Sequence, residues 1–125
     1  MYIEGSVDGG TSWAATWRGT NYLVNNSNAF EVQVQALTAT YRLAQSQIST
    51  AAANGLSGTL TLHYPVSGGQ AQVVGTLGYQ NLYSLYYLPV VTTIAWNNAS
   101  ELNAVRFSYG AGTITTGTIK IYGVT

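Results

Sequence analysis

The sequence predicts an all-β protein, an antiparallel β-sandwich of about eight strands and, more narrowly, a jelly roll. Two observations carry this prediction. Apolar and polar side chains alternate along several short runs, which is the period of a strand with one face in a core. Clusters of Gly, Asn, Asp and Pro separate these runs at intervals of about 8–14 residues. The sequence shows no internal repeat, so a propeller is not expected.

Composition sets the limits on domain count and partners. The chain has 125 residues, of which 46% are hydrophobic, so we expect one domain over residues 1–125 with its own core. Charged residues make up 6% of the chain and the formal net charge is zero, with the four basic residues scattered. This pattern predicts neither a nucleic-acid partner nor insertion into a membrane. The apolar region 82–96 is too short for a membrane span and is interrupted by Pro89.

A β-hairpin is predicted at the start of the chain. Residues 2–7 alternate as a first strand, and the Asp-Gly-Gly sequence at 8–10 is a turn that allows positive φ. Residues 11–17 form the predicted return strand, with Trp13 and Trp17 on the core side.

The middle of the chain is predicted to hold further strands at residues 30–36, 41–48, 59–64, 71–77 and 89–96. In the run 30–36, alternation places Val32 and Val34 inward. In the run 59–64, it places Leu60, Leu62 and Tyr64 inward. Residues 37–48 also show helical spacing of apolar residues, but their β-branched and polar content favours a strand.

The chain is predicted to close with two strands, at residues 103–109 and 118–124, joined by a glycine-rich turn. Val105 and Phe107 point inward in the first of them. In the second, Ile119 and Ile121 point inward, and Lys120 and Tyr122 point outward.

No catalytic residue is predicted. The chain has four acidic residues, all on predicted turns or outward positions, where carboxylates are ordinarily solvated: Glu4, Asp8, Glu31 and Glu101. His63 is the only histidine, so a histidine metal site would need three copies around a symmetry axis. A plain outward strand histidine is the favoured interpretation, and we expect no metal and no cofactor.

Aromatic side chains are the candidates for ligand binding. Three Trp and ten Tyr give rings with a polar group, which are enriched at interfaces and can stack on sugar rings. The alternative role of each ring is to fill the core. The candidate ligand-binding residues are Trp17, Tyr83, Tyr86, Tyr87 and Trp96.

Two resemblances extend these predictions. The motif Ser6-x-Asp8-x-Gly10-x-Ser12-Trp13 resembles the Asp-box of sialidase-like proteins, which implies that Asp8 ties a turn together rather than acting in catalysis. The closing stretch Ala-Val-Arg-Phe-Ser-Tyr-Gly at 104–110, with the ending Ile-Tyr-Gly at 121–123, resembles bacteriophage virion proteins of tail fibres and tail tips. The Leu-Ser-Gly-Thr run at 56–59 is similar to the same family.

The phage resemblance implies a non-enzymatic structural or host-recognition domain of the virion, an extracellular particle. It implies a homo-oligomer, with a trimer favoured, contacts with other virion proteins, and a host-surface glycan as ligand. Arg106, Lys120 and Tyr122 are its candidate interface residues. In the family a strand and a Pro-containing loop usually precede the Asp-Gly-Gly hairpin, whereas this chain begins inside the hairpin. Either this chain lacks that N-terminal strand or a partner chain supplies the edge. A free-standing carbohydrate-binding module and, less favoured, a glycan hydrolase are the alternatives.

Overall fold

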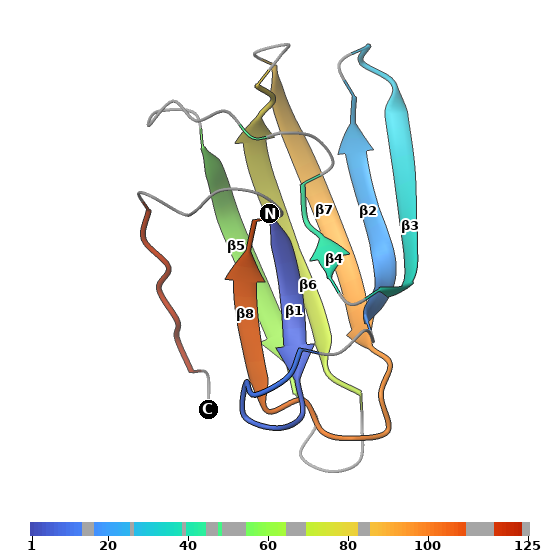
Figure 1. Ribbon diagram of the computed structural model, residues 1–125. Helices are drawn as coiled ribbons and strands as arrows, with labels where there is room; N and C mark the ends of the chain where they lie inside the picture. Colours follow the sequence, from blue (N-terminus) through green and yellow to red (C-terminus); the bar gives the residue numbers. More distant parts are fainter. Residues whose placement is uncertain are drawn as a thin grey trace.

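The computed structural model describes residues 1–13, 17–25, 27–38, 40–44, 48, 55–64, 70–82, 86–109 and 117–123. These residues form two antiparallel sheets that face each other (Figure 1). The strands are β1 (Tyr2–Ser6), β2 (Trp17–Val24), β3 (Phe30–Thr38), β4 (Tyr41–Arg42), β5 (Leu56–His63), β6 (Gln72–Gln80), β7 (Tyr87–Trp96) and β8 (Ala104–Ser108).

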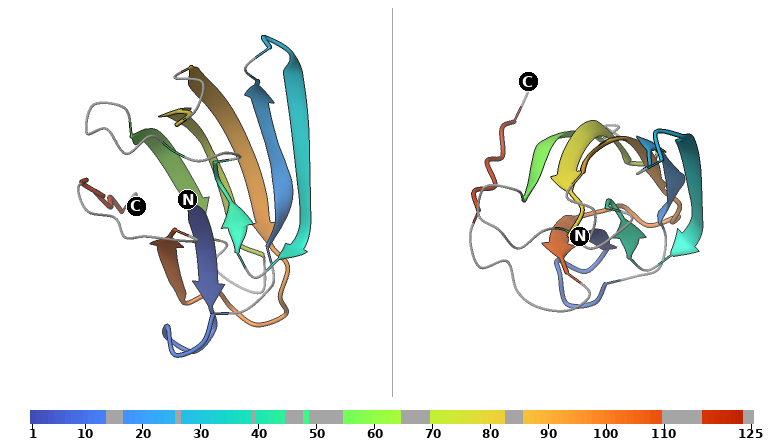
Figure 2. Two further views of the ribbon diagram at one scale, coloured as in Figure 1. Left: turned by 45° about the horizontal axis from the view of Figure 1, so that its top comes forward. Right: turned by 90° about the horizontal axis from the view of Figure 1, so that it is seen from above.

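The smaller sheet has the strand order β4-β1-β8, and the larger sheet has the order β3-β2-β7-β6-β5. Seen from above, the larger sheet curves around the smaller one (Figure 2). The predicted all-β sandwich with antiparallel strands is therefore confirmed. The first strand pairs with the last and the second with the last but one. The narrower assignment to a jelly roll stays a prediction.

The predicted N-terminal hairpin is wrong. The turn after β1 is present, but β1 pairs with β4 and β8, and β2 lies in the other sheet between β3 and β7. The chain therefore crosses from one sheet to the other after the turn. Local spacing can predict a tight turn, but it cannot tell whether the two strands beside it pair with each other.

The core lies between the sheets, and two tryptophans are its largest fully buried side chains. Trp17 of β2 and Trp96 of β7 are cross-strand partners whose rings meet edge to face at 5.0 Å. Their exposed fractions are 0% and 1%, respectively. Ile3 from β1 and Tyr41 from β4 close the core from the smaller sheet.

A buried polar cluster joins the two sheets beside β4. The Asn21 amide oxygen accepts hydrogen bonds from the hydroxyls of Thr92, at 2.7 Å, and Tyr41, at 3.1 Å. The Asn21 amide nitrogen donates to the Arg42 carbonyl at 2.8 Å. Burial raises the pKa of Tyr41 to about 12. Every polar atom of the Asn21 side chain thus has a partner across the sandwich.

The predicted orientation of β3 is wrong. Val32 and Val34 are 48% and 73% exposed and lie on the face turned away from the smaller sheet. The glutamine and glutamate side chains of β3 take the inner face because they find partners there. The Gln35 amide donates to the Arg42 carbonyl at 2.9 Å and accepts from the Arg42 backbone N–H at 2.9 Å. A hydrogen-bonded amide can replace an apolar side chain on an inner face.

The predicted strand at 41–48 is also shorter than expected. Tyr41 and Arg42 form β4, and Ile48 makes a single bridge to Asn81. The pairing of β4 with β1 involves the same two residues, so the Asn21 and Gln35 side chains supply much of its attachment.

The predicted final strand is wrong as well. Residues 117–123 form no strand and are all exposed, with Ile119 at 58% and Ile121 at 90%. The segment runs beside the sandwich as a separate extended trace (Figure 1). The alternation of Ile119 and Ile121 is that of a strand, but a strand also needs a hydrogen-bonding neighbour, which alternation does not supply.

Candidate functional site

The candidate functional surface is the outer face of the larger sheet, the face turned away from β1, β4 and β8. Strand pairing places every second residue of its five strands on this face. Eight large apolar or aromatic side chains there are between 37% and 73% exposed, and we call them the outer patch: Tyr22, Val24, Phe30, Val32, Val34, Val74, Tyr87 and Val91. Soluble monomers rarely leave a contiguous apolar surface of this kind exposed.

Residues of the outer patch are neighbours across adjacent strands. Tyr22 of β2 pairs with Val32 of β3 on one side and with Val91 of β7 on the other. The rings of Tyr22 and Phe30 stack at 6.1 Å with 25° between their planes. Among the described strand residues on this face, Arg18 is the only one with a permanent charge. The outer patch is therefore largely apolar and nearly neutral.

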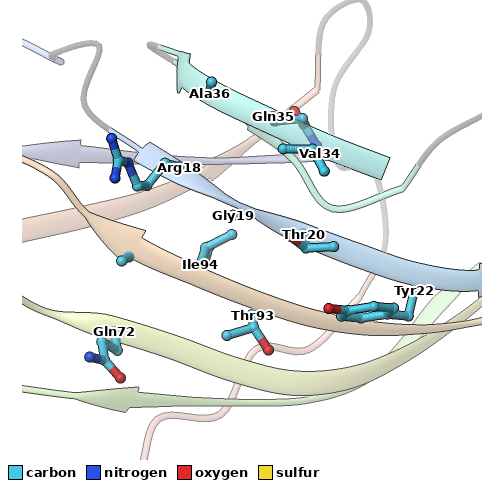
Figure 3. A pocket seen from close by; sticks show the side chains of 11 residues that line it. Arg18, Gly19, Thr20, Tyr22, Val34, Gln35, Ala36, Gln72, Thr93 and Ile94 are labelled. Atoms are coloured by element: carbon cyan, nitrogen blue, oxygen red, sulfur yellow. The ribbon is translucent and has the colours of Figure 1, made fainter. Parts of the chain in front are cut away.

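A groove of about 580 Å³ opens on this face between β3, β2, β7 and β6 (Figure 3). The Arg18 side chain stands at one end and the Tyr22 ring at the other. The floor is formed in part by Gly19, where a side chain would collide with Ile94 and with the Thr93 carbonyl. Thr20, Thr93 and Gln72 add polar groups. An aromatic ring, a cation and several hydroxyl or amide groups are the chemistry that binds a neutral, polar ligand such as a sugar.

Two of the five predicted ligand-binding residues are wrong. Trp17 and Trp96 are buried in the core and no sugar ring can reach them. Both rings lie on the inner face of the larger sheet, at paired positions of β2 and β7, and Trp96 packs against Gly5 of β1. Tyr86 and Tyr87 are 61% and 56% exposed and stay candidates. Tyr83 lies outside the described residues.

Tyr87 has a defined place at the far end of the outer face. Its ring lies against Gly78 of the neighbouring strand, and its hydroxyl is 3.1 Å from the Ser57 hydroxyl of β5. A side chain at position 78 would occupy the space of this ring, since a Cβ there would lie 2.7 Å from it. The ring is therefore fixed flat on the sheet while one face stays open to solvent.

The Asp-box-like turn has the geometry that its sequence predicts. The Asp8 carboxylate accepts hydrogen bonds from the Ser12 hydroxyl and the Ser6 hydroxyl, both at 2.6 Å, and from the Ser12 backbone N–H at 2.8 Å. The hydrogen bonds from Ser12 lower the pKa of Asp8 to about 2. Gly9 and Gly10 have φ values of 70° and 91°, which favour glycine. Asp8 thus acts as a turn-forming residue.

Arg106, a predicted interface residue, joins β8 to β1, and its interface role stays a prediction. Its guanidinium donates to both Glu4 carboxylate oxygens, at 2.8 and 2.9 Å, and lies 4.3 Å from the centre of the Trp13 ring. The Ser108 hydroxyl donates to Glu4 at 2.6 Å. The Arg106 hydrogen bond lowers the pKa of Glu4. Arg106 therefore has a structural role in the chain, whatever else it contacts.

Lys120 and Tyr122, the other predicted interface residues, lie in the exposed segment 117–123. Tyr122 is 77% exposed. The segment 117–123 runs on the β5 and β8 side of the sandwich (Figure 2).

The carboxylates are spread over the molecule. Glu4 lies on the smaller sheet, Asp8 in the turn after β1, and Glu31 on β3, where Asn25 and Gln33 donate to it. Glu101 is exposed in the segment before β8, and His63 is exposed at the end of β5. Within the described part of the chain, no group of three or more His, Cys, Asp or Glu residues could hold a metal ion. The described residues also contain no helix long and apolar enough to cross a membrane.

Sequence reasoning missed the residues of the outer patch and the groove. Val32 and Val34 were assigned to the core because apolar residues in an alternating strand ordinarily face inward. The sequence of β3 carries one signal, because its valines alternate with Gln33 and Gln35. Their amide groups can form hydrogen bonds with a neighbouring strand, so the face with the glutamines can also be buried. Arg18 and Tyr22 gave no local signal, because their place depends on how β2 and β7 pair.

The fold and this surface define a two-sheet β-sandwich with an apolar outer face. No protein-family model, curated protein or solved structure matches the chain.

Proposed function

We propose that this chain is a non-enzymatic structural and host-recognition domain of a bacteriophage virion, a module of a tail fibre or tail tip. In this proposal it acts as a homotrimer, contacts other virion proteins and binds a glycan of the host surface. The phage setting rests on the resemblance of residues 56–59, 104–110 and 121–123. The jelly-roll form of the sandwich belongs to the same proposal.

One observation carries the assembly part of the proposal. The outer patch exposes eight apolar or aromatic side chains on a nearly neutral sheet face. Burying this face against another copy removes apolar area from water and leaves few charges to desolvate. Tyr22, Phe30 and Tyr87 are residues of the type that carry binding energy at interfaces.

The arrangement of the acidic residues supports a non-enzymatic role. Glu4 is held by Arg106 and Ser108, and Asp8 by the turn hydroxyls. Both carboxylates have lowered pKa values, so they stay ionised at neutral pH and are poor general acids. General acid and base catalysis of glycoside cleavage needs two carboxyl groups facing each other, one of them with a raised pKa.

The solution mass of the purified chain tests the assembly. We expect three times the chain mass of 13.3 kDa by sedimentation velocity or light scattering. The double variant Val32→Thr, Val34→Thr keeps β-branched side chains and should shift the population toward monomer. The matched control is Thr59→Ser, Thr61→Ser, on the same face of the edge strand β5. A monomeric wild type, or a variant that assembles like the wild type, would overturn this part of the proposal.

A free-standing carbohydrate-binding module is the second candidate, and the groove favours it. The Tyr22 ring, the Arg18 guanidinium and the Thr and Gln side chains line one open cavity. A glycan array on the wild type, followed by Arg18→Gln and Tyr22→Ala, distinguishes the candidates. A monomer that binds one sugar and loses it in both variants favours the module. A trimer that binds whole cells favours the virion domain.

A further inference from the structure

The two lateral edges of the sandwich differ in the contacts that join the two sheets. On the side of β3 and β4, side chains of Asn21 and Gln35 bond the Arg42 peptide and join the sheets. On the other side, the sheets end with β8 and β5, each of which pairs with one of the described strands. We call this second side the open seam.

Apolar side chains of both sheets lie half exposed along the open seam. Phe107 of β8 is the cross-strand partner of the buried Ile3, and Val105 lies on the same face of β8 as Phe107. The Val105 side chain therefore points between the sheets, yet it is 38% exposed. Leu62 of β5 is paired with the buried Val73 and is 43% exposed. Tyr64 follows β5 and is 44% exposed. The inner faces of the last strands are therefore only partly covered.

The segment 117–123 could supply the apolar side chains that would cover the open seam. It is extended, its Ile119 and Ile121 alternate with Lys120 and Tyr122, and all four are exposed. A strand added to the free edge of β8 would turn Ile119 and Ile121 toward Leu62 and Tyr64. Lys120 and Tyr122 would then lie on the face that carries Glu4, Arg106 and Ser108, where polar groups are already present.

We infer that the open seam is a docking site for the segment 117–123 of a second copy of this chain, which adds to β8 as a fourth strand of the smaller sheet. The chain's own segment lies on the same side of the sandwich but forms no strand there, and Ile121 is 90% exposed. Because each copy carries both a β8 edge that pairs with no further described strand and an exposed segment 117–123, copies can complete one another without a further protein. This inference rests on the homo-oligomer of the proposed function and names a contact separate from the outer patch.

Assembly of aspartate variants gives the first test. Ile119→Asp with Ile121→Asp places charge on the face that would be buried, and we expect at least a tenfold loss of association in sedimentation equilibrium. The control, Thr118→Asp, adds an aspartate to the opposite face and should associate within about threefold of the wild type. Both variants should keep the wild-type circular dichroism spectrum, because residues 117–123 are exposed. Equal association of the two variants overturns the inference.

Crosslinking identifies the donor of the strand. The chain has no cysteine, so single substitutions give unique thiols. A Val105→Cys protein mixed with a larger tagged Ile121→Cys protein, then treated with a short bismaleimide, should give a covalent heterodimer. A crosslink only within one chain of the double variant Val105→Cys, Ile121→Cys means that the segment docks on its own copy and overturns the inference. Absence of any crosslink overturns it too.

The outcomes also separate this contact from the outer patch. If Val32→Thr, Val34→Thr abolishes assembly and the heterodimer does not form, the proposed interface stands and the strand exchange fails. If the heterodimer forms and the valine variant assembles normally, strand exchange stands and the outer patch is not the interface.

Discussion

Glu4 and Arg106 are directly opposite each other in the ladder between β1 and β8, and their side chains meet through two hydrogen bonds of 2.8 and 2.9 Å. The Glu4 side chain is 8% exposed and the Arg106 side chain 46%. The pair therefore joins the first and last strands of the sandwich, with one partner buried and the other at the surface. Trp13 covers the guanidinium and couples the pair to the Asp8 turn.

Removal of the arginine should be more harmful than its replacement by lysine. Arg106→Ala leaves the buried Glu4 with Ser108 as its remaining charge-stabilising partner and exposes the Trp13 face. Arg106→Lys keeps the charge but loses the two-pronged contact. We expect urea midpoints in the order wild type, Arg106→Lys, Arg106→Ala, from highest to lowest. An Arg106→Ala variant as stable as the wild type contradicts the role given to this pair.

Stability should fall in acid because two carboxylates have lowered pKa values in the folded state. A lowered pKa stabilises the fold above the unfolded-state value, about 3.9 for Asp and 4.3 for Glu, and this contribution is lost as pH falls through the folded-state value. For Asp8 the loss extends down to a pH of about 2. Urea unfolding between pH 7 and pH 2 should show this decline. Glu4→Gln and Asp8→Asn should each have a flatter profile than the wild type over the acidic range.

Gly5 is predicted to tolerate no side chain. A Cβ at this position would collide with the Trp96 ring and would lie 2.7 Å from Leu102. Both neighbours are buried, so the strain cannot be relieved by a shift into solvent. Gly5→Ala should lower the free energy of unfolding by about 1–3 kcal/mol. Gly55→Ala is the control, since nothing lies within 4 Å of its Cβ position, and it should change stability by less than about 0.5 kcal/mol.

The Asn21 cluster should be costly to disrupt. Asn21→Ala removes one hydrogen-bond partner each from Thr92, Tyr41 and the Arg42 carbonyl, in a position that is 0% exposed. We expect a loss of about 3 kcal/mol in denaturant unfolding. Thr92→Val removes one hydroxyl from the same cluster and should cost about 1 kcal/mol. Equal losses in the two variants would mean that the amide contributes no more than a single hydrogen bond.

Features that depend on residues close together in the sequence could be predicted from the sequence. The Asp8 turn depends on residues 6 to 12, so its motif was enough to predict it. The alternating runs predicted most strands, including β5, β6 and β7. What failed depends on contacts between distant residues: which strand β1 pairs with, which face of β3 is buried, and whether residues 118–124 find a neighbour. The outer patch and the groove are of this second kind, so no signal in the sequence indicated Arg18 and Tyr22. Tyr86 and Tyr87 are exposed, and their ligand-binding role stays a prediction.

The amide of Gln35 bonds both the carbonyl and the N–H of Arg42, just as a peptide group of a neighbouring strand would. In an ordinary amphipathic strand, a slip of one residue is penalised because it moves all apolar side chains into water. In β3 the valines are already in water, so hydrophobicity gives little protection against such a slip. The alignment of β3 is therefore specified by directional polar contacts. A change of Gln35 to an apolar residue of similar size should yield a protein that still folds but populates more than one alignment of its edge strand.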